Sequence, residues 1–164
     1  MKVLHALGVS IGLLVAVWVY VSIGLPELKL VPWIGFVAWA AFYAAGGGRA
    51  GIVKPLGAST AGILLTVITM YAVGQAGGGL VALMALVAIL AFVLVAMADI
   101  GTFSYTPAAF LGAATYFGSG AKLDESIAYV ILSWVAGLLL GYASEAIGMK
   151  IARPAEATPQ SGPA

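Results

Sequence analysis

Long apolar runs alternate with short polar or glycine-bearing segments along the whole chain. The runs without a charged residue cover residues 6–26, 30–48, 55–98, 100–121 and 126–144. About 20 apolar residues of helix cross the roughly 30 Å hydrocarbon core of a bilayer. Because backbone N–H and C=O groups inside lipid must be satisfied within a segment, these non-alternating runs predict membrane-spanning helices.

The longest run, residues 55–98, is long enough for two spans, and the glycine-bearing stretch 74–79 divides it. Six spans follow, at about residues 4–24, 30–46, 54–74, 79–98, 104–119 and 125–147. The sequence therefore predicts an all-α membrane protein with six transmembrane helices in a single domain, residues 1–150.

The distribution of lysine and arginine predicts the orientation. If the N-terminus is cytoplasmic, five cationic residues lie on that side and two on the other. The five are Lys2, Arg49, Lys54, Lys150 and Arg153, and the two are Lys29 and Lys122. Since cytoplasmic loops carry the excess of cationic residues, both termini are expected in the cytoplasm. Residues 151–164 are polar and proline-bearing, which predicts a short disordered cytoplasmic tail.

The second half of the chain resembles the first after a shift of 75 residues. From Pro32 to Leu65, eight of 34 positions are identical to the residue 75 places later, against about three expected for so biased a composition. Pro32 pairs with Pro107 and Phe42 with Phe117. Three spans per half make the halves, about residues 1–75 and 76–150, cross the membrane in opposite senses. Such inverted repeats are typical of transport proteins.

The second and fifth spans are short, begin at a proline and are rich in alanine, glycine and aromatic residues. As a helix, residues 107–120 would be about 21 Å long, which is less than the bilayer core. The polar segment 101–106 comes before them, and Pro107 disfavours helix at Thr106. A pair of short or interrupted segments in matching places points to the solute site of a transporter, at the interface of the halves.

These segments also carry a resemblance to a known family. Its anchors are the region from Trp33 to Tyr43, the stretch from Thr106 to Phe117 and residues 136–142 of the last span. From about Leu4 to Ala152 the chain resembles the bacterial inner-membrane family catalogued as domain of unknown function 1097. The resemblance implies a multi-pass protein of the bacterial inner (plasma) membrane. It implies no activity, because the family has none that is settled.

Composition excludes several classes of function. Only 13 of the 164 residues are charged, whereas soluble domains have roughly 25%. The chain has no cysteine and a single histidine, His5, so one subunit cannot assemble a nucleophile–base triad or a histidine metal cluster. We therefore expect no enzymatic activity, no metal and no cofactor. The net charge of +1 indicates no nucleic-acid partner.

The polar side chains at membrane depth are uncharged. Hydroxyl groups can replace a solute's lost hydrogen bonds to water without trapping it by a full charge. Together with the aromatic residues of the short spans, they predict a pathway lined by Thr106, Pro107, Phe110, Tyr116, Phe117, Trp39, Phe42, Ser59, Thr60 and Trp134. The alternative for any one hydroxyl is a bond to its own backbone or to a neighbouring helix.

Two acids lie near the ends of spans. Asp99 stands just before the interrupted fifth segment, where it could cap that segment, act as a gate or couple transport to protons. The alternative is an interfacial carboxylate in water. Glu145 is expected to be a solvated residue near Lys150.

The sequence favours a channel or facilitator for a small, mostly neutral polar solute of the urea, amide or ammonia class, with a pathway in each subunit. One alternative is a proton-coupled secondary transporter of a small organic ion, with Asp99 as the coupling group. Another is a non-transporting scaffold that binds a membrane protein through the fourth span, which has no hydroxyl, amide or charge from Leu80 to Ala98. The short second and fifth segments would need shielding from lipid, so we expect a homo-oligomer, with a trimer favoured.

Overall fold

Six α-helices make up most of the computed structural model, which describes residues 1–152. The helices are α1 (Val3–Val19), α2 (Pro32–Ala44), α3 (Gly48–Gln75), α4 (Leu80–Ala96), α5 (Thr106–Gly118) and α6 (Ser126–Ile151). A π-helical segment, η1 (Tyr20–Gly24), extends α1, and short 3-10 turns lie at η2 (Pro26–Leu28), η3 (Met97–Asp99) and η4 (Gly101–Phe103). No strand occurs within residues 1–152, so the predicted all-α class is confirmed. All but the first two residues of the predicted tail lie outside the described part of the chain.

Four helical segments are long and apolar enough to cross a membrane. They are Val3–Gly24, Gly48–Gln75, Leu80–Asp99 and Ser126–Ile151. Helices α2 and α5 have 13 residues each, which gives a length of about 20 Å. These two are the second and fifth spans, the ones that the sequence predicted to be short. The fold is thus that of a multi-pass membrane protein.

The two short helices begin and end in the same way. Each has a proline in its first turn, where the missing N–H group costs nothing. At the end of α2, the Gly47 N–H group donates to the carbonyl of Phe42, and at the end of α5 the Ala121 N–H group donates to that of Tyr116. The residues before these donors, Gly46 and Gly120, have φ values of 100° and 93°. This left-handed backbone is the usual glycine ending of a helix.

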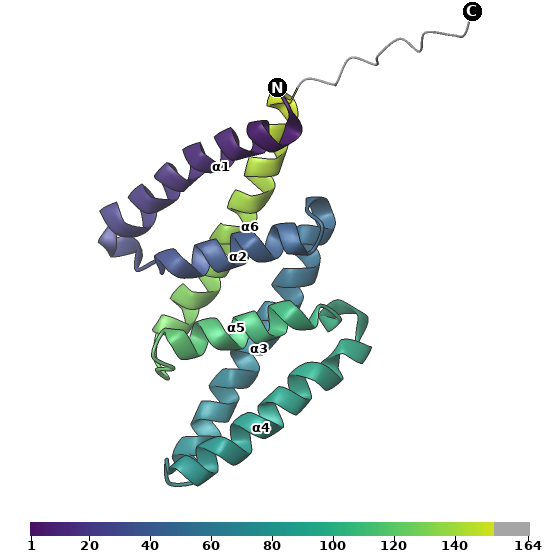
Figure 1. Ribbon diagram of the computed structural model, residues 1–164. Coiled ribbons are helices and arrows are strands. Elements are labelled where there is room, and N and C mark those ends of the chain that lie inside the picture. Colours follow the sequence, from purple (N-terminus) through teal and green to yellow (C-terminus); the bar gives the residue numbers. More distant parts are fainter. Residues whose placement is uncertain (153–164) are drawn as a thin grey trace, which may run out of the picture.

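The helices form two layers (Figure 1). Helices α1, α2, α5 and α4 follow one another from top to bottom in one layer, and α6 and α3 cross behind them. Helix α2 packs along α6 and α5 along α3, while α1 lies on α6 and α4 on α3. The short helix of each half therefore packs on the last helix of the other half.

Glycines let these crossing helices approach backbone to backbone. A Cβ atom added to Gly62 of α3 would lie 2.1 Å from the carbonyl oxygen of Ala109 in α5. A Cβ atom added to Gly137 of α6 would lie 2.2 Å from the carbonyl oxygen of Gly35 in α2. Gly112 of α5 is in the same position against the carbonyl oxygen of Ser59, also at 2.2 Å. No side chain larger than hydrogen fits at these crossings, which is why small residues gather there.

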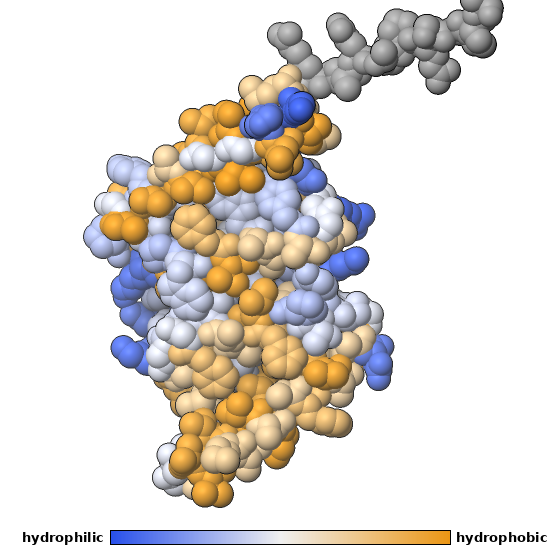
Figure 2. Space-filling view, in the orientation of Figure 1, coloured by the Kyte–Doolittle hydropathy of each residue, from blue (hydrophilic) through white to orange (hydrophobic). Residues whose placement is uncertain are grey.

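The surface has the character expected of a protein in contact with lipid. Figure 2 shows hydrophilic residues at the left and right edges of the molecule and mainly apolar or weakly polar residues between them. Helix α4 exposes six large apolar side chains: Leu80, Val81, Met84, Ile89, Phe92 and Val95. An apolar surface of this size would be unfavourable in water and is at home in a bilayer.

Candidate functional site: a polar vestibule above a buried indole–hydroxyl pair

A polar pocket opens at the end of the molecule where α5 ends and α6 begins. We call it the vestibule; its volume is about 350 Å³ and its lining residues are Lys29, Val31, Ser119, Lys122, Asp124, Glu125, Ser126, Tyr129 and Val130. The vestibule draws on both halves of the chain, because Lys29 and Val31 come from the connection between α1 and α2. Two cationic and two anionic side chains line it, so their formal charges cancel.

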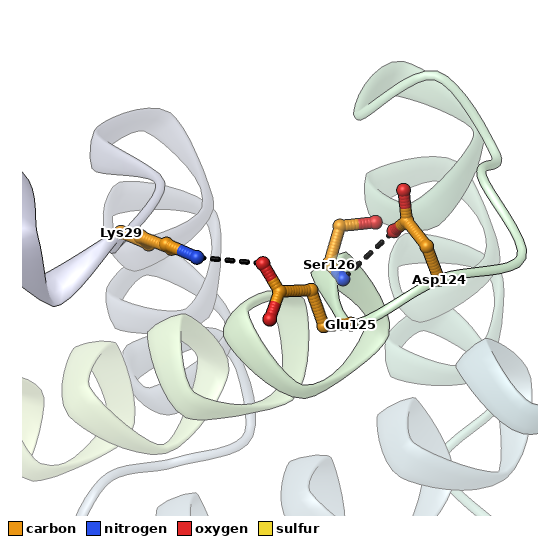
Figure 3. A network of polar contacts seen from close by, with 4 residues as sticks. All are labelled: Lys29, Asp124, Glu125 and Ser126. Atoms are coloured by element: carbon orange, nitrogen blue, oxygen red, sulfur yellow. Dashed lines mark hydrogen bonds and ion pairs between the residues drawn. The ribbon is translucent and has the colours of Figure 1, made fainter.

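The charged groups of the vestibule are held by hydrogen bonds (Figure 3). The Lys29 ammonium donates to a Glu125 carboxylate oxygen at 2.6 Å and lies 5.1 Å from the centre of the Tyr129 ring. This bond to Glu125 raises the pKa of Lys29. Asp124 accepts a bond from the Ser126 N–H group at 2.8 Å, and its bonds to Ser126 hold the pKa of Asp124 below its usual value. All four charges of the vestibule therefore persist at neutral pH.

A buried polar pair lies one helical turn below the vestibule. Ser119 and Val130 line the vestibule, and four residues deeper along α5 and α6 lie Thr115 and Trp134. The Trp134 indole N–H group donates to the Thr115 hydroxyl oxygen at 2.8 Å, and that hydroxyl donates to the Gly112 carbonyl at 2.8 Å. Both side chains are 1% exposed. The pair is the deepest polar contact beneath the vestibule and joins α5 to α6.

Apolar packing closes the centre of the molecule beside this pair. A single cluster of buried side chains contains Ile34, Ala38, Ala41, Phe42, Ile63, Tyr116, Val130, Trp134 and Leu138. These residues come from α2, α3, α5 and α6, so both halves contribute. Within residues 1–152, no buried side-chain nitrogen or oxygen lacks a hydrogen-bond partner. The structure is thus a closed state in which the polar groups of the interior satisfy one another.

The structure brings some of the predicted pathway residues together and separates others. Phe42, Tyr116 and Trp134 meet in the central cluster. Phe110 and Phe117 instead line an apolar pocket of about 170 Å³ between α4 and α5. Trp39 lies elsewhere, with its indole N–H group 3.0 Å from the Ser144 hydroxyl.

The remaining predicted residues lie along the contact of α3 with α5 or at the start of α5. Ser59 is fully buried, with its hydroxyl 3.4 Å from the carbonyl of Leu56. Thr60 and Thr106 are half-buried, and Pro107 is exposed. Asp99 is also exposed, and α5 has no side-chain cap at its N-terminus, so Asp99 does not cap that helix here. These ten residues do not line one common cavity in the closed state, and their role in a pathway stays a prediction.

Sequence reasoning missed the polar contacts that Ser144 and Glu145 make near the end of α6. The Ser144 hydroxyl accepts from Trp39 and bonds Tyr43 at 2.7 Å, while its backbone carbonyl accepts from Ser10 at 2.7 Å. Glu145 is half-buried and accepts from the Gly48 N–H group at 2.6 Å. The expected free, solvated Glu145 is therefore wrong. A serine–glutamate pair in an otherwise apolar span was the available signal.

Metal ligands do not gather in this molecule. Among residues 1–152, no group of three histidine, cysteine, aspartate or glutamate side chains could hold a metal ion.

Comparisons with known proteins agree with the fold but assign no activity. Residues 8–149 match the family described as "Protein of unknown function (DUF1097)". Two relatives come from Escherichia coli strain K12. The "Uncharacterized protein YahC" is 32% identical over 159 residues, which cover 92% of this chain and 94% of the relative. The "Inner membrane protein YcdZ" is 27% identical over 154 residues, which cover 93% of this chain and 90% of the relative. No solved structure matches the chain.

Proposed function

Because the chain belongs to the family described as "Protein of unknown function (DUF1097)", whose description states no activity, we propose a function from its packing and chemistry. We propose that this protein is a passive facilitator of small, uncharged polar solutes, and not an enzyme. The pathway runs between the two halves of each subunit and has the vestibule as one mouth.

The observation that carries this proposal is the repeated contact between the halves. Gly62 of α3 lies against Ala109 of α5, and Gly137 of α6 lies against Gly35 of α2. The two glycines are 75 residues apart, and their partners are 74 residues apart. The same crossing therefore occurs twice, once in each half, and Figure 1 draws α1 and α4 running in opposite senses. This supports an inverted repeat, an architecture in which transporters place the solute pathway between the halves.

The one-residue difference refines the pairing that the sequence predicted. A shift of 74 residues relates the ends of the short helices and pairs Phe42 with Tyr116, rather than with Phe117. Phe42 and Tyr116 are both buried in the central cluster. We propose that they form the closed gate between the halves, and that the pathway opens where they separate.

The solute class follows from the charges. Every charged residue of the vestibule lies at its rim in a connection or at the start of α6, and the residues below it are uncharged. An ion that left the vestibule would lose its water with no opposite charge to replace it, at a cost of several kcal/mol. A neutral solute loses only hydrogen bonds, which hydroxyl and indole groups can restore. Neutral molecules of the urea and amide class are therefore the proposed cargo.

The setting of the protein follows from the same features. We propose an inner-membrane location with both termini in the cytoplasm, which places the vestibule outside. The short helices expose Trp33, Phe36, Phe110 and Leu111. Because about 20 Å of helix leaves part of a 30 Å core uncovered, we propose that other copies of the chain shield these helices, with a trimer favoured. Light scattering of the detergent-solubilised protein, corrected for detergent, gives the number of copies.

Flux measurements test the proposed function. The purified protein in liposomes is given osmotic jumps with urea, formamide, acetamide, glycerol or formate, and light scattering follows the swelling. Neutral solutes should enter faster than into empty liposomes, and formate should not. Ser119→Trp, which fills the vestibule, should slow the uptake. Ser104→Trp is the matched control, because Ser104 is exposed in the connection before α5.

Two results would contradict the facilitator. If all solutes enter at the rate of empty liposomes, the proposal fails. If uptake instead needs a pH gradient and Asp99→Asn abolishes that dependence, the protein is a coupled transporter. Since Asp99 is exposed and does not cap α5, we expect Asp99→Asn to leave the passive uptake unchanged.

A further inference from the structure

We infer that Trp134 and Thr115 form the solute-binding site of the pathway and that the site selects an unsubstituted amide. The solute carbonyl accepts from the Trp134 indole N–H group, and a solute N–H group donates to the Thr115 hydroxyl oxygen. This inference rests on the proposed facilitator function and adds to it the residues and the chemistry of recognition.

The position of the pair is the first reason. Thr115 and Trp134 lie one turn below Ser119 and Val130, which line the vestibule, so a solute that passes the vestibule reaches them first. They belong to different helices, α5 and α6, which share few contacts with each other. Their hydrogen bond at 2.8 Å is the only side-chain hydrogen bond between these two helices within residues 1–152. A solute can therefore insert here without breaking a close helix–helix crossing.

Hydrogen-bond accounting is the second reason. A threonine hydroxyl has one donor and two acceptor lone pairs. Thr115 uses its donor on the Gly112 carbonyl and one lone pair on the Trp134 indole. When an amide enters between them, the indole N–H group passes to the solute carbonyl, and the vacated lone pair accepts a solute N–H. Because Thr115 keeps its bond to Gly112, no buried polar group is left without a partner, which would cost about 1–3 kcal/mol.

A second indole–hydroxyl pair in the molecule shows why this one is different. Trp39 donates to Ser144, but the Ser144 hydroxyl also donates to the Gly141 carbonyl and bonds the Tyr43 hydroxyl. Its donor and both lone pairs are in use, so it has no capacity for a solute. The Trp39–Ser144 pair is also absent from the vestibule lining. It is a tie between α2 and α6, and it serves as the matched control.

Variants measured in the liposome assay test the inference. Thr115→Val removes the acceptor and should slow acetamide uptake about tenfold, the factor expected for one lost hydrogen bond. Thr115→Ser keeps the hydroxyl and should restore the uptake. Trp134→Phe removes the donor and should slow the uptake to a similar degree, whereas Trp39→Phe should leave it near the wild-type rate.

A competition between two isomers gives a readout that a purely structural role would not move. Propionamide carries N–H donors, and its isomer N,N-dimethylformamide carries none. Propionamide should inhibit acetamide uptake by the wild type, and N,N-dimethylformamide should not. In Thr115→Val this difference should disappear. The melting temperature of each variant in detergent shows whether it is folded, and Thr115→Ser shows whether the hydroxyl alone accounts for a loss.

The outcomes separate this inference from the proposed function. If the wild type carries acetamide and Thr115→Val and Trp134→Phe carry it equally well, the facilitator stands and the assigned site is wrong. If both isomers inhibit equally, the amide N–H is not read and the inference is again overturned. If the wild type carries none of the five solutes, the facilitator function itself fails.

Discussion

The two short helices have the same backbone packing but are held by different chemistry. Helices α2 and α5 each cross the last helix of the other half at a glycine, Gly137 for α2 and Gly62 for α5. Side-chain hydrogen bonds also tie α2 to α6. Within residues 1–152, none joins α5 to α3. One short helix is thus fixed, and the other is held by shape alone.

The bonds between the α2 region and α6 occur at both ends of α2. Before its start, Lys29 pairs with Glu125, and the Val31 N–H group donates to the Ser133 hydroxyl at 2.8 Å. Towards its end, Trp39 and Tyr43 bond Ser144. Because these bonds have direction as well as strength, sliding α2 along α6 would break several at once.

The long helices α1 and α4 differ in the same sense. Helix α1 is bonded to α6 through the Ser10 hydroxyl and the Ser144 carbonyl. Helix α4 has no hydroxyl, amide or charge from Leu80 to Ala98, and apolar pockets of about 170 and 230 Å³ lie beside it against α5 and α3. The comparison indicates that α1, α2 and α6 form the scaffold, and that α4 and α5 are the helices with freedom to shift.

The largest expected effect comes from filling the two glycine crossings. Gly62→Ala and Gly137→Ala each place a Cβ atom 2.1–2.2 Å from a carbonyl oxygen, and each should lower the free energy of unfolding by about 2–3 kcal/mol. Gly8→Ala is the control, because a Cβ atom there meets nothing within 4 Å. Thermal melting in detergent measures all three. A large loss for one crossing and none for the other would contradict their equivalence.

Removing the central tie of the scaffold should have the next largest effect. In Ser144→Ala, the Trp39 and Tyr43 side chains lose a buried hydrogen-bond partner, which should cost about 1–3 kcal/mol. Ser59→Ala is the counterpart on the α5 side, where the hydroxyl has only a 3.4 Å contact to the carbonyl of Leu56. Its melting temperature should stay close to the wild-type value. Equal losses in the two variants would show that α2 is held no more firmly than α5.

Glu145 allows a finer test of the same scaffold. It accepts from the Gly48 N–H group at the start of α3, where a carboxylate is stabilised by the helix dipole. Glu145→Ala should cost about 1 kcal/mol. Glu145→Gln keeps an acceptor oxygen and should lose less. If the two variants melt at the same temperature as the wild type, the contact does not stabilise the fold.

The fold was predictable from the sequence as far as local patterns determine it. Apolar run length gave the spans, residues 74–79 marked a break, and Pro32 and Pro107 marked the starts of the short helices. The rotation of each helix was not encoded in this way, because a span that is apolar on every side has no polar face to orient it. Phe110 therefore faces the pocket beside α4 rather than the centre.

The candidate site was predictable in kind but not in its pairs. Trp134 was predicted because hydroxyl and aromatic groups gather at membrane depth, yet its partner Thr115 was not singled out. The contacts of Ser144 join residues about 100 or more positions apart. Such pairs depend on the angle and register at which two helices cross, which no local pattern gives.

The smallest expected effect concerns the ion pair that ties the start of α2 to α6. Lys29 and Glu125 are more than half exposed, at 51% and 70%, and exposed pairs are weak. Because Glu125 raises the pKa of Lys29, the contribution of the pair is fully present below the ordinary pKa of lysine and is lost as the pH rises through the raised value. Glu125→Gln should therefore lower the melting temperature less than any variant of Ser144 or Glu145 that loses its acceptor. The difference from the wild type should shrink at about pH 11–12 and in high salt. A difference that grew under those conditions would show that Glu125 acts through something other than its charge.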